Sequence, residues 1–412
     1  VYSYFHGHSS FLNSIISNNS PQEIYFPSVH ETSFMSVSYS NIEGGQESIV
    51  TNDNATITWG DGNIDVDSRF VDEENDDYHL LASSPCINSG DPDFTDSDGT
   101  RSDIGVYPYL TDNTEPVWYI NTAGNDTTGT GTFVNPFASI QAAFNFVEDN
   151  GTIQVAEGTY YENVIWPQST EKIGVQLLGD NRETTIIDGG DSGSVMHVEW
   201  VDSTSYMSGF TLQNGLAEYG GGLHLSSSEM TFENLIITEN HATNWGGGMY
   251  IAGPANGYTW TPHMNDIIFS NNNSDSHGDV AYLDSYSTTT ITNSIIEDHI
   301  ITSNHNLIAC SQYGNLDLDN VIIRNNYLVG YLISTYQITN VNIKNSQIVN
   351  NVNTGGGGRL ITLSGYASVN IENTLIADNE AGVIYQGTSD SFSAHLSLNE
   401  VTMTRNISSN GI

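Results

Sequence analysis

The feature that most constrains the fold of this chain is a short phrase that recurs from residue 208 onward. The phrase is an Asn, several β-branched or apolar residues, and a second Asn about six positions later, with its clearest copy from Asn234 to Asn240. Its first position recurs at intervals of 31, 28, 27, 25, 28 and 27 residues, and Glu400 replaces Asn in the last copy. Intervals of this size are typical of one coil of a stacked solenoid. We therefore predict a parallel β-helix with three faces per coil.

Glycine-rich turns lie between the copies, as at 220–222, 246–248 and 356–358, and each precedes a short β-branched or aromatic run. Glycine adopts the positive φ angles of tight corners, and the runs have the composition of strands. Stacked carboxamides can hydrogen-bond from coil to coil, so we predict that the recurring Asn residues form a structural ladder. The predicted ladder positions are Asn13, Asn234, Asn265, Asn293, Asn320, Asn345 and Asn373.

The chain is strongly acidic, with 49 Asp and Glu residues against 8 Lys and Arg and a formal net charge of −41. This field opposes binding to nucleic acids, anionic polysaccharides and anionic membranes, unless divalent cations bridge the charges. No apolar stretch is long enough to span a bilayer, so we expect no membrane insertion. Cys86 and Cys310 lie far apart in sequence, and we expect each to be a small buried side chain.

Two segments carry a resemblance to a known family. Residues 135–144 and 151–160 read as a short helix followed by a first strand, with Ser139 as N-cap and Ile140, Ala143, Phe144 and Val147 on the apolar face. They resemble the start of right-handed β-helix proteins of the pectate-lyase-like superfamily, of the Asn- and Gly-rich secreted bacterial surface type. The resemblance implies an all-β, right-handed parallel β-helix solenoid with a short capping helix.

The closing segment of that family is similar to residues 78–90 and 103–107, which precede the opening segment in this chain. The predicted chain order is therefore permuted. Residues 1–70 form the last coils of one β-helix, 71–110 its closing cap, 111–117 a linker, 118–150 the opening segment with the capping helix, and 151–412 the coils of the next β-helix.

Writing residue 412 directly before residue 1 keeps the repeat in register, because Asn13 then follows Glu400 by 25 residues. Either the chain is one period of a tandem polypeptide, or separate subunits join head to tail by β-augmentation; a fragment with arbitrary ends is the alternative. The predicted assembly interface consists of Val1, Tyr2, Tyr4, Phe11, Ile15, Val401, Met403, Ile407 and Ile412.

An Asp-rich loop around Gly99 is the strongest metal-like signal. Alternating carboxylates before a Gly suit Ca²⁺, which takes six to eight oxygen ligands, although the loop lacks the final Glu of an EF-hand. The alternative for this loop is an Asp-rich turn held by Arg101. His6 and His8 are a second candidate metal pair, because alternate residues of a strand share a face; the alternative is that they are plain surface or ladder histidines. The candidate calcium ligands are Asp91, Asp93, Asp96, Asp98 and Asp103.

No catalytic motif of the family is matched residue by residue, so we predict that the chain is not an enzyme. A hydrolase would need a carboxylate pair, for which several acids between Asp279 and Asp319 are available. Aromatic residues such as Trp245, Tyr250, Trp260, Tyr282 and Tyr331 stack either inside the coils, which we favour, or on sugars. Sequons that permit glycosylation lie at Asn18, Asn54, Asn125, Asn272 and Asn406.

These features favour a secreted structural subunit of an extracellular filament or surface fibre, assembled head to tail with copies of itself and adhesive in role. The alternative is a carbohydrate-active or carbohydrate-binding β-helix protein, similar to polysaccharide lyases or hydrolases, with glycans as partners. A third hypothesis is a discrete adhesin spike on a phage or cell surface.

Overall fold

The chain divides into two compact units, residues 1–147 and residues 148–412. The regular structure of both units is mainly short strands, joined by turns and loops that make up most of residues 1–147, and α1 (Ile140–Phe146) is the one α-helix among the described residues. The computed structural model describes residues 1, 7–28, 32–111, 113, 115–253, 258–301, 303–355, 359–386 and 394–407.

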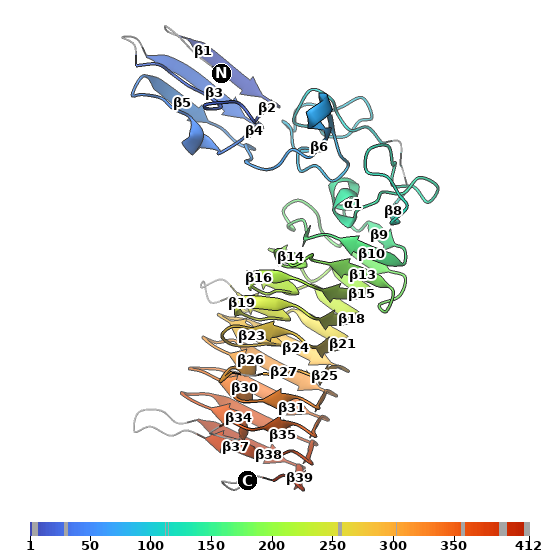
Figure 1. Ribbon diagram of the computed structural model, residues 1–412, viewed down its shortest axis with the longest axis vertical. Helices are drawn as coiled ribbons and strands as arrows, with labels where there is room; N and C mark the ends of the chain where they lie inside the picture. The colour runs from blue at the N-terminus through green and yellow to red at the C-terminus, as the bar shows by residue number, and fades with distance from the viewer. Residues whose placement is uncertain are drawn as a thin grey trace. The chain divides into compact units, whose positions relative to one another are not determined.

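Residues 148–412 form a parallel β-solenoid in which equivalent strands of successive coils lie side by side as rungs (Figure 1). The predicted all-β, parallel β-helix fold is therefore confirmed. The long sheet contains β9 (Thr152–Val155), β10 (Gly158–Tyr161), β12 (Gln176–Gly179), β13 (Thr185–Asp188), β15 (Tyr206–Gln213), β18 (Thr231–Thr238), β21 (His263–Ser270), β24 (Thr288–Thr292), β25 (Ile295–Glu297), β27 (Asn315–Asp319), β28 (Ile322–Arg324), β31 (Asn340–Lys344), β32 (Gln347–Val349), β35 (Ser368–Glu372), β36 (Leu375–Ala377), β38 (His395–Asn399) and β39 (Thr402–Thr404).

A second sheet and two narrow sheets complete the coils. The second sheet contains β11 (Val164–Ile165), β14 (Met196–Glu199), β17 (Leu223–Ser226), β20 (Met249–Ala252), β23 (Ala281–Asp284), β26 (Asn306–Cys310), β30 (Tyr331–Thr335), β34 (Arg359–Leu363) and β37 (Gly382–Gln386). The narrow sheets contain β16 (Leu216–Tyr219), β19 (His241–Trp245) and β22 (Asn273–Ser274), and β29 (Tyr327–Leu328) and β33 (Val352–Asn353).

Alternation along each strand builds the core of the solenoid. Leu235 on β18 pairs with Ile267 on β21, Ile237 pairs with Phe269, and all four side chains are fully buried. Because adjacent residues of a strand point to opposite faces, every second position of the stacked strands enters one continuous apolar column.

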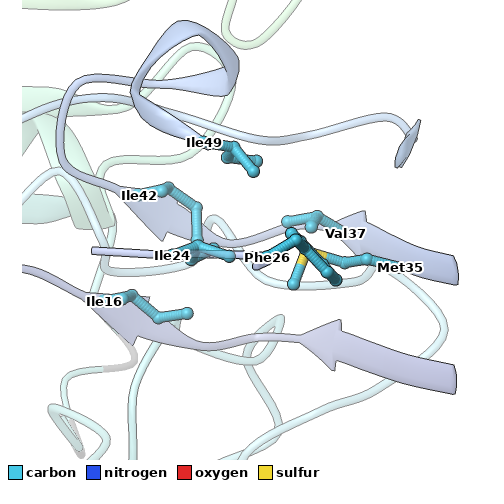
Figure 2. Packing of buried hydrophobic residues seen from close by; sticks show 7 residues of the cluster. All are labelled: Ile16, Ile24, Phe26, Met35, Val37, Ile42 and Ile49. Carbon is cyan, nitrogen blue, oxygen red and sulfur yellow. The ribbon is translucent and has the colours of Figure 1, made fainter. Parts of the chain in front are cut away.

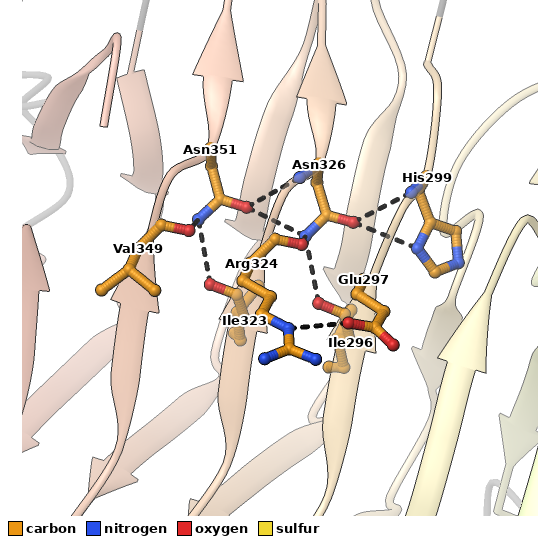
Figure 3. Close-up of polar contacts among 8 residues, drawn as sticks. All are labelled: Ile296, Glu297, His299, Ile323, Arg324, Asn326, Val349 and Asn351. Carbon is orange, nitrogen blue, oxygen red and sulfur yellow. Dashed lines mark hydrogen bonds and ion pairs between the residues drawn. The ribbon is translucent and has the colours of Figure 1, made fainter. Parts of the chain in front are cut away.

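A ladder of buried carboxamides runs through the same coils (Figure 3). The backbone N–H and the Nδ2 of Asn326 both donate to Oδ1 of Asn351, at 3.2 and 2.9 Å, and Asn351 donates in the same way to Asn379. Each Nδ2 also donates to a carbonyl oxygen of the neighbouring coil, as that of Asn351 does to Ile323. The ladder residues are Asn240, Asn272, His299, Asn326, Asn351, Asn379 and Asn406, each at most 8% exposed.

The buried ladder is thus formed by the second Asn of each phrase, whereas the prediction assigned the ladder to the first Asn. The first Asn lies at an outer corner, where Asn234, Asn293 and Asn320 have φ angles of 53°, 53° and 56°. These partly or fully exposed residues do form a second column, since Asn320 donates to Asn293 and Asn293 donates to Asn265. In the remaining copies Asn373 donates to Asn345, and Asn345 donates to Asp319.

One copy of the phrase is shifted by a residue from its predicted alignment. Glu233 pairs with Asn265 and Leu235 pairs with Ile267, so Asp266, with a φ of 54°, is the corner equivalent of Asn234.

The unit of residues 1–147 begins with three more coils. Strands β1 (His8–Leu12), β3 (Ser33–Ser38) and β5 (Ala55–Trp59) form one parallel sheet, and β2 (Ile15–Ile16) pairs with β4 (Asn41–Ile42). Figure 2 shows the apolar side chains that these strands and their turns bury together. The cluster consists of Ile16, Ile24, Phe26, Met35, Val37, Ile42 and Ile49.

The remainder of this unit contains an antiparallel hairpin, β6 (Phe70–Asp72) and β7 (Asp77–Leu80), then β8 (Val117–Ile120) and α1. The helix packs by Phe146 on the rings of Trp118 and Phe137, with centroids 5.3 and 5.2 Å away. Ser139 is the N-cap residue, yet its side chain makes no capping hydrogen bond. Asp126 Oδ1 instead accepts the N–H groups of Ala138 and Ser139.

Each unit contains one cysteine, Cys86 or Cys310, and both are free and fully buried, as predicted. Burial raises the pKa of the Cys310 thiol to about 12. Within the described residues, no helix is long and apolar enough to cross a membrane.

Candidate functional site

A row of aromatic and imidazole rings lies on the outer side of four adjacent strands of the second sheet. His197, His224, Tyr250 and Tyr282 are register partners on β14, β17, β20 and β23. Their strand neighbours, among them Met196 and Leu223, are fully buried in the coil, so the rings project outward. The centroids of successive rings are 4.7, 5.4 and 6.0 Å apart. We call these four residues, together with Tyr219 and Trp245, the aromatic face.

Tyr219 and Trp245 join the row from β16 and β19. The Trp245 ring stacks on Tyr282 at 4.7 Å with an interplanar angle of 8°, and the Tyr219 ring lies 5.1 Å from Tyr250. Glycine corners bring the two sheets this close. Gly220 has a φ of 62°, and a Cβ atom there would lie 2.5 Å from the Leu223 carbonyl oxygen, so no larger residue fits.

Polar atoms are spaced among these rings. Burial, and secondly the neighbouring His197, lowers the pKa of His224 to about 4, so its imidazole is neutral at physiological pH. Burial also raises the pKa of the Tyr250 phenol, whose O–H donates to Asp284 Oδ2 at 3.4 Å. The face therefore combines partly exposed rings with neutral donors and acceptors and with the carboxylates of Asp284, Glu199 and Glu218, while Tyr282, 7% exposed, is covered by Trp245.

A second aromatic group follows β14 and precedes β24. The Trp260 ring makes edge contacts with Trp200 and Tyr258, at 5.8 and 5.1 Å, and the latter two side chains are 41% and 56% exposed. The expectation that such residues stack inside the coils is wrong for Tyr250, which occupies an outward strand position, and for Trp245, which stacks on that outer face. It failed because tryptophan and tyrosine are as compatible with the outward positions of a strand as with the inward ones.

Tyr250 and Tyr282 were named from the sequence, but His197, His224 and Tyr219 were not, and the sequence analysis did not place these residues in one row. His197, His224, Tyr250 and Tyr282 follow one another at intervals of 27, 26 and 32 residues, close to the period of the Asn phrase. Comparing residues one coil period apart in the sequence reveals this row of rings, whereas a search for short motifs does not.

The acidic residues considered as a hydrolase pair are dispersed over the coils. Asp279 accepts hydrogen bonds from the backbone and hydroxyl of Ser274, and burial raises its pKa to about 7. Glu297 forms an ion pair with Arg324 at 2.7 Å. Asp317 and Asp319 accept from Asn342 and Asn345. Of this set, Asp284 is the residue that contacts the aromatic face.

The Asp-rich loop uses its carboxylates to bind its own backbone. Asp103 accepts the N–H groups of Asn88 and Tyr109, both at 2.7 Å, and burial raises its pKa to about 7. Asp96 accepts from Asp103 N, Asp98 from Thr100 and Thr111, and Asp91 from Asp93 N. Arg101 donates to the Gly90 carbonyl.

Within the described residues, no three His, Cys, Asp or Glu side chains lie in an arrangement that could hold a metal. The calcium site stays a prediction. His6 lies outside the described residues, and the ring of His8 stacks on Phe34 at 5.0 Å.

The five sequons differ in exposure. Asn18 and Asn125 are exposed, whereas Asn54, Asn272 and Asn406 are 7%, 3% and 8% exposed. The Nδ2 atoms of the three buried residues donate to carbonyl oxygens of Pro27, Ile237 and Ile376, respectively.

Of the predicted assembly residues, Tyr2, Tyr4 and Ile412 lie outside the described residues. Val1 is 46% and Ile407 is 72% exposed, and Phe11, Ile15, Val401 and Met403 are partly exposed on outermost coils of their units.

No family model and no curated protein matches the chain. Solved structures that match include a pectin methylesterase from carrot, at 11% identity over 71% of this chain and 85% of that one, with a TM-score of 0.44. A rhamnogalacturonan lyase matches at 13% identity over 64% and 68%, with a TM-score of 0.32. The A-module of the mannuronan C-5 epimerase AlgE6 from Azotobacter vinelandii matches at 15% over 63% and 86%, with a TM-score of 0.28.

These three proteins are enzymes by name, and the finding contradicts the prediction that the chain is not an enzyme. The prediction depended on finding a catalytic motif within a short stretch of sequence. In a solenoid, residues that share a surface come from successive coils and are separated by a full repeat, so a local motif is not required.

Proposed function

We propose that this chain is a carbohydrate-active β-helix protein that binds uncharged glycans along its aromatic face. The observation that carries the proposal is the row of rings on β14, β17, β20 and β23, joined by Trp245 stacked at 4.7 Å on Tyr282. Aromatic rings offer large apolar surfaces with polar edges, which suits the apolar faces and hydroxyl rims of sugar rings. Several coils side by side would accommodate an extended chain of sugars.

The charge of the molecule favours neutral sugars. The strands β14, β17, β20 and β23 contain no Lys or Arg, and the formal net charge of the chain is −41. A polyanionic sugar would meet repulsion without a cationic group to offset it. Hydroxyl groups of an uncharged glycan can instead hydrogen-bond to Asp284, neutral His224 and Tyr250.

Asp284 is the side chain on which we place the chemistry of the face, as an acceptor for a sugar hydroxyl and as the acid–base group of any reaction there. Glu199 lies in the same outward column as Asp284. Ser226 and Ala252 occupy the two strands between them, so the two carboxylates are three rungs apart. At about 4.8 Å per rung the two strand positions are about 14 Å apart, wider than the carboxylate pairs of glycoside hydrolases. A two-carboxylate hydrolysis by this pair is therefore not part of the proposal.

Calorimetric titration with uncharged oligosaccharides, and analysis of the same mixtures for reaction products, test the proposal. We expect Trp245→Ala and Tyr250→Ala each to weaken binding at least about tenfold, equivalent to about 1.4 kcal/mol. Tyr161→Ala is the matched control, because Tyr161 is 77% exposed on the long sheet. Unchanged affinity in both face variants, or preference for polyanionic sugars, would refute the proposal.

A secreted location and a role in a filament or surface fibre are compatible with this function and stay predictions. Sugar binding along the sides of the coils leaves the outermost coils available for other contacts.

A further inference from the structure

The unit of residues 1–147 contains a cavity that shares no residue with the aromatic face. Its volume is about 310 Å³, near the lower end for pockets that bind small molecules. Three segments of this one unit line it: strand β7, residues 108–110 and the loop of residues 127–130. The cavity is therefore a separate candidate for a binding site.

One wall of the cavity carries a carboxylate and an imidazole in a fixed arrangement. Asp77 and His79 are alternate residues of β7, so they lie on the same face of the strand. Asp77 Oδ1 accepts from His79 Nδ1 at 2.7 Å and from the His79 backbone N–H at 3.2 Å. The hydrogen bond from the His79 side chain lowers the pKa of Asp77. The carboxylate is thus ionised, and His79 carries a hydrogen on Nδ1.

This arrangement leaves the other nitrogen of His79 for a ligand. The Tyr107 ring stacks on the imidazole at a centroid distance of 4.5 Å and holds its orientation. The His79 side chain is 62% exposed, and no described residue forms a hydrogen bond with Nε2. In the neutral ring Nε2 is an acceptor, and Asp77 Oδ2 is a second one. A ligand hydroxyl can donate to either atom.

The loop of residues 127–130 supplies hydroxyl groups. Asn125 Oδ1 accepts the N–H groups of Thr127 and Thr128, at 2.7 and 2.9 Å, which fixes the backbone of the loop. Both threonines are exposed, and no hydrogen bond joins their hydroxyl groups to a described residue. Each hydroxyl can therefore donate to a ligand or accept from it.

The rest of the lining is mainly apolar, and part of it is held rigidly. Tyr109 is buried, its O–H donates to the Gly129 carbonyl at 2.7 Å, and its N–H donates to Asp103 Oδ2. Leu80 is buried and Leu110 is exposed. The cavity thus combines apolar surface with a few free acceptors and hydroxyls, as is usual for sites that bind small molecules.

The charges of this unit disfavour a charged ligand. Residues 1–147 include no Lys, and the two Arg residues, Arg69 and Arg101, donate to the backbone carbonyls of Ser83 and Gly90. An anion would meet the Asp77 carboxylate without a cation to offset it. A cation would compete with His79 for the same carboxylate. An uncharged molecule with several hydroxyl groups and an apolar side matches both parts of the lining.

We propose that this cavity is a second carbohydrate site, which binds a single uncharged sugar residue such as the end of a glycan chain. Sugar hydroxyls donate to His79 Nε2 and Asp77 Oδ2. Others pair with the hydroxyl groups of Thr127 and Thr128, while Leu110 contacts the apolar side of the sugar ring. The cavity and the aromatic face belong to different units, so this inference does not rest on the proposed function.

Histidine NMR of the full chain reads the two sites separately. In a chain labelled with carbon-13 at histidine, the variants His79→Gln, His197→Gln and His224→Gln identify the three signals. The probes, added at constant pH, are glucose, galactose, mannose and xylose, with glucuronate and glucosamine as charged comparisons. We expect at least one neutral sugar to shift the His79 signal to saturation. The signals of His197 and His224 report on the aromatic face in the same samples.

Two variants of the lining test the contacts. Thr128→Val removes one hydroxyl group with little change of shape and should weaken binding about threefold to tenfold. Asp77→Ala should weaken it further, because it also releases His79. Thr122→Val is the matched control, since Thr122 is exposed in the same unit and does not line the cavity. Unchanged signals of the other histidines would show that each variant folds.

Three results would overturn the proposal. The first is a His79 signal that none of the neutral sugars shifts. The second is tighter binding of glucuronate or glucosamine than of every neutral sugar. The third is wild-type affinity in both Thr128→Val and Asp77→Ala.

Discussion

Two columns of asparagine run along the same coils, and they have opposite environments. The buried column, from Asn240 to Asn406, connects adjacent coils through paired hydrogen bonds inside the solenoid. The corner column, including Asn293 and Asn320, is exposed and makes single side-chain contacts. Residue type and period are the same, so the difference in role comes from burial. A carboxamide contributes strongly where its partners have no access to water, and little where water can replace it.

The largest expected effect comes from interrupting the buried column. Asn351→Leu would remove the acceptor of two Asn326 donors and the donor to the Ile323 carbonyl. Because these groups stay buried, we expect a loss of roughly 3 kcal/mol in the free energy of unfolding. Urea denaturation followed by circular dichroism measures it. A loss below that of the corner variant described below would contradict the distinction between the two columns.

The second effect comes from completing the buried column at His299. Its N–H and Nδ1 meet Asn326 Oδ1, but Nε2 is buried without a partner. In His299→Asn, the new Oδ1 would receive the donors of Asn272, and the new Nδ2 would reach the Phe269 carbonyl, by the pattern of the other rungs. We expect a gain of about 1 to 2 kcal/mol at pH 7. Equal or lower stability in urea would show that the imidazole is already well accommodated.

The same variant tests a pH dependence. Burial lowers the pKa of His299 to about 4 in the folded chain, against about 6.5 for an unfolded histidine. The unfolded state therefore binds more protons between these values, and the stabilisation present above pH 6.5 is lost as pH falls toward 4. Asp103 and Asp279, with pKa values raised to about 7, act in the opposite sense over this range. The difference in stability between His299→Asn and wild type should therefore widen on acidification.

The smallest effect is expected in the corner column. Asn320 has a φ of 56° and donates to Asn293 at 2.8 Å on the surface. Asn320→Gly keeps the backbone angle without strain and should change stability by less than about 0.5 kcal/mol. Asn320→Ala should cost about 1 kcal/mol, because alanine disfavours the left-handed conformation. Equal losses in the two variants would show that the side-chain hydrogen bond, rather than the backbone angle, decides the role of this column.

The sequence predicted the coil because the Asn phrase returns at the period of one rung, and it predicted the helix through Ile140 and Phe144. It did not show which Asn points inward, since both positions of the phrase share the period. The second position accepts His299 as its one exception, whereas the corner accepts Asp266 and Glu400. Burial restricts the residue type at the second position more strictly than exposure does at the corner. Trp245, Tyr250 and Tyr282 were named individually, but their grouping with His197, His224 and Tyr219 was not predicted, because these residues meet only through the stacking of coils.

The two buried thiols give each unit an internal reporter of opening. A thiol reagent attacks through the thiolate, and the raised pKa and full burial of Cys310 suppress both ionisation and access. Labelling of Cys310 would then follow separation of the central rungs, and labelling of Cys86 would follow opening of residues 1–147. The rates of the two reactions would reveal whether the two units open together or independently.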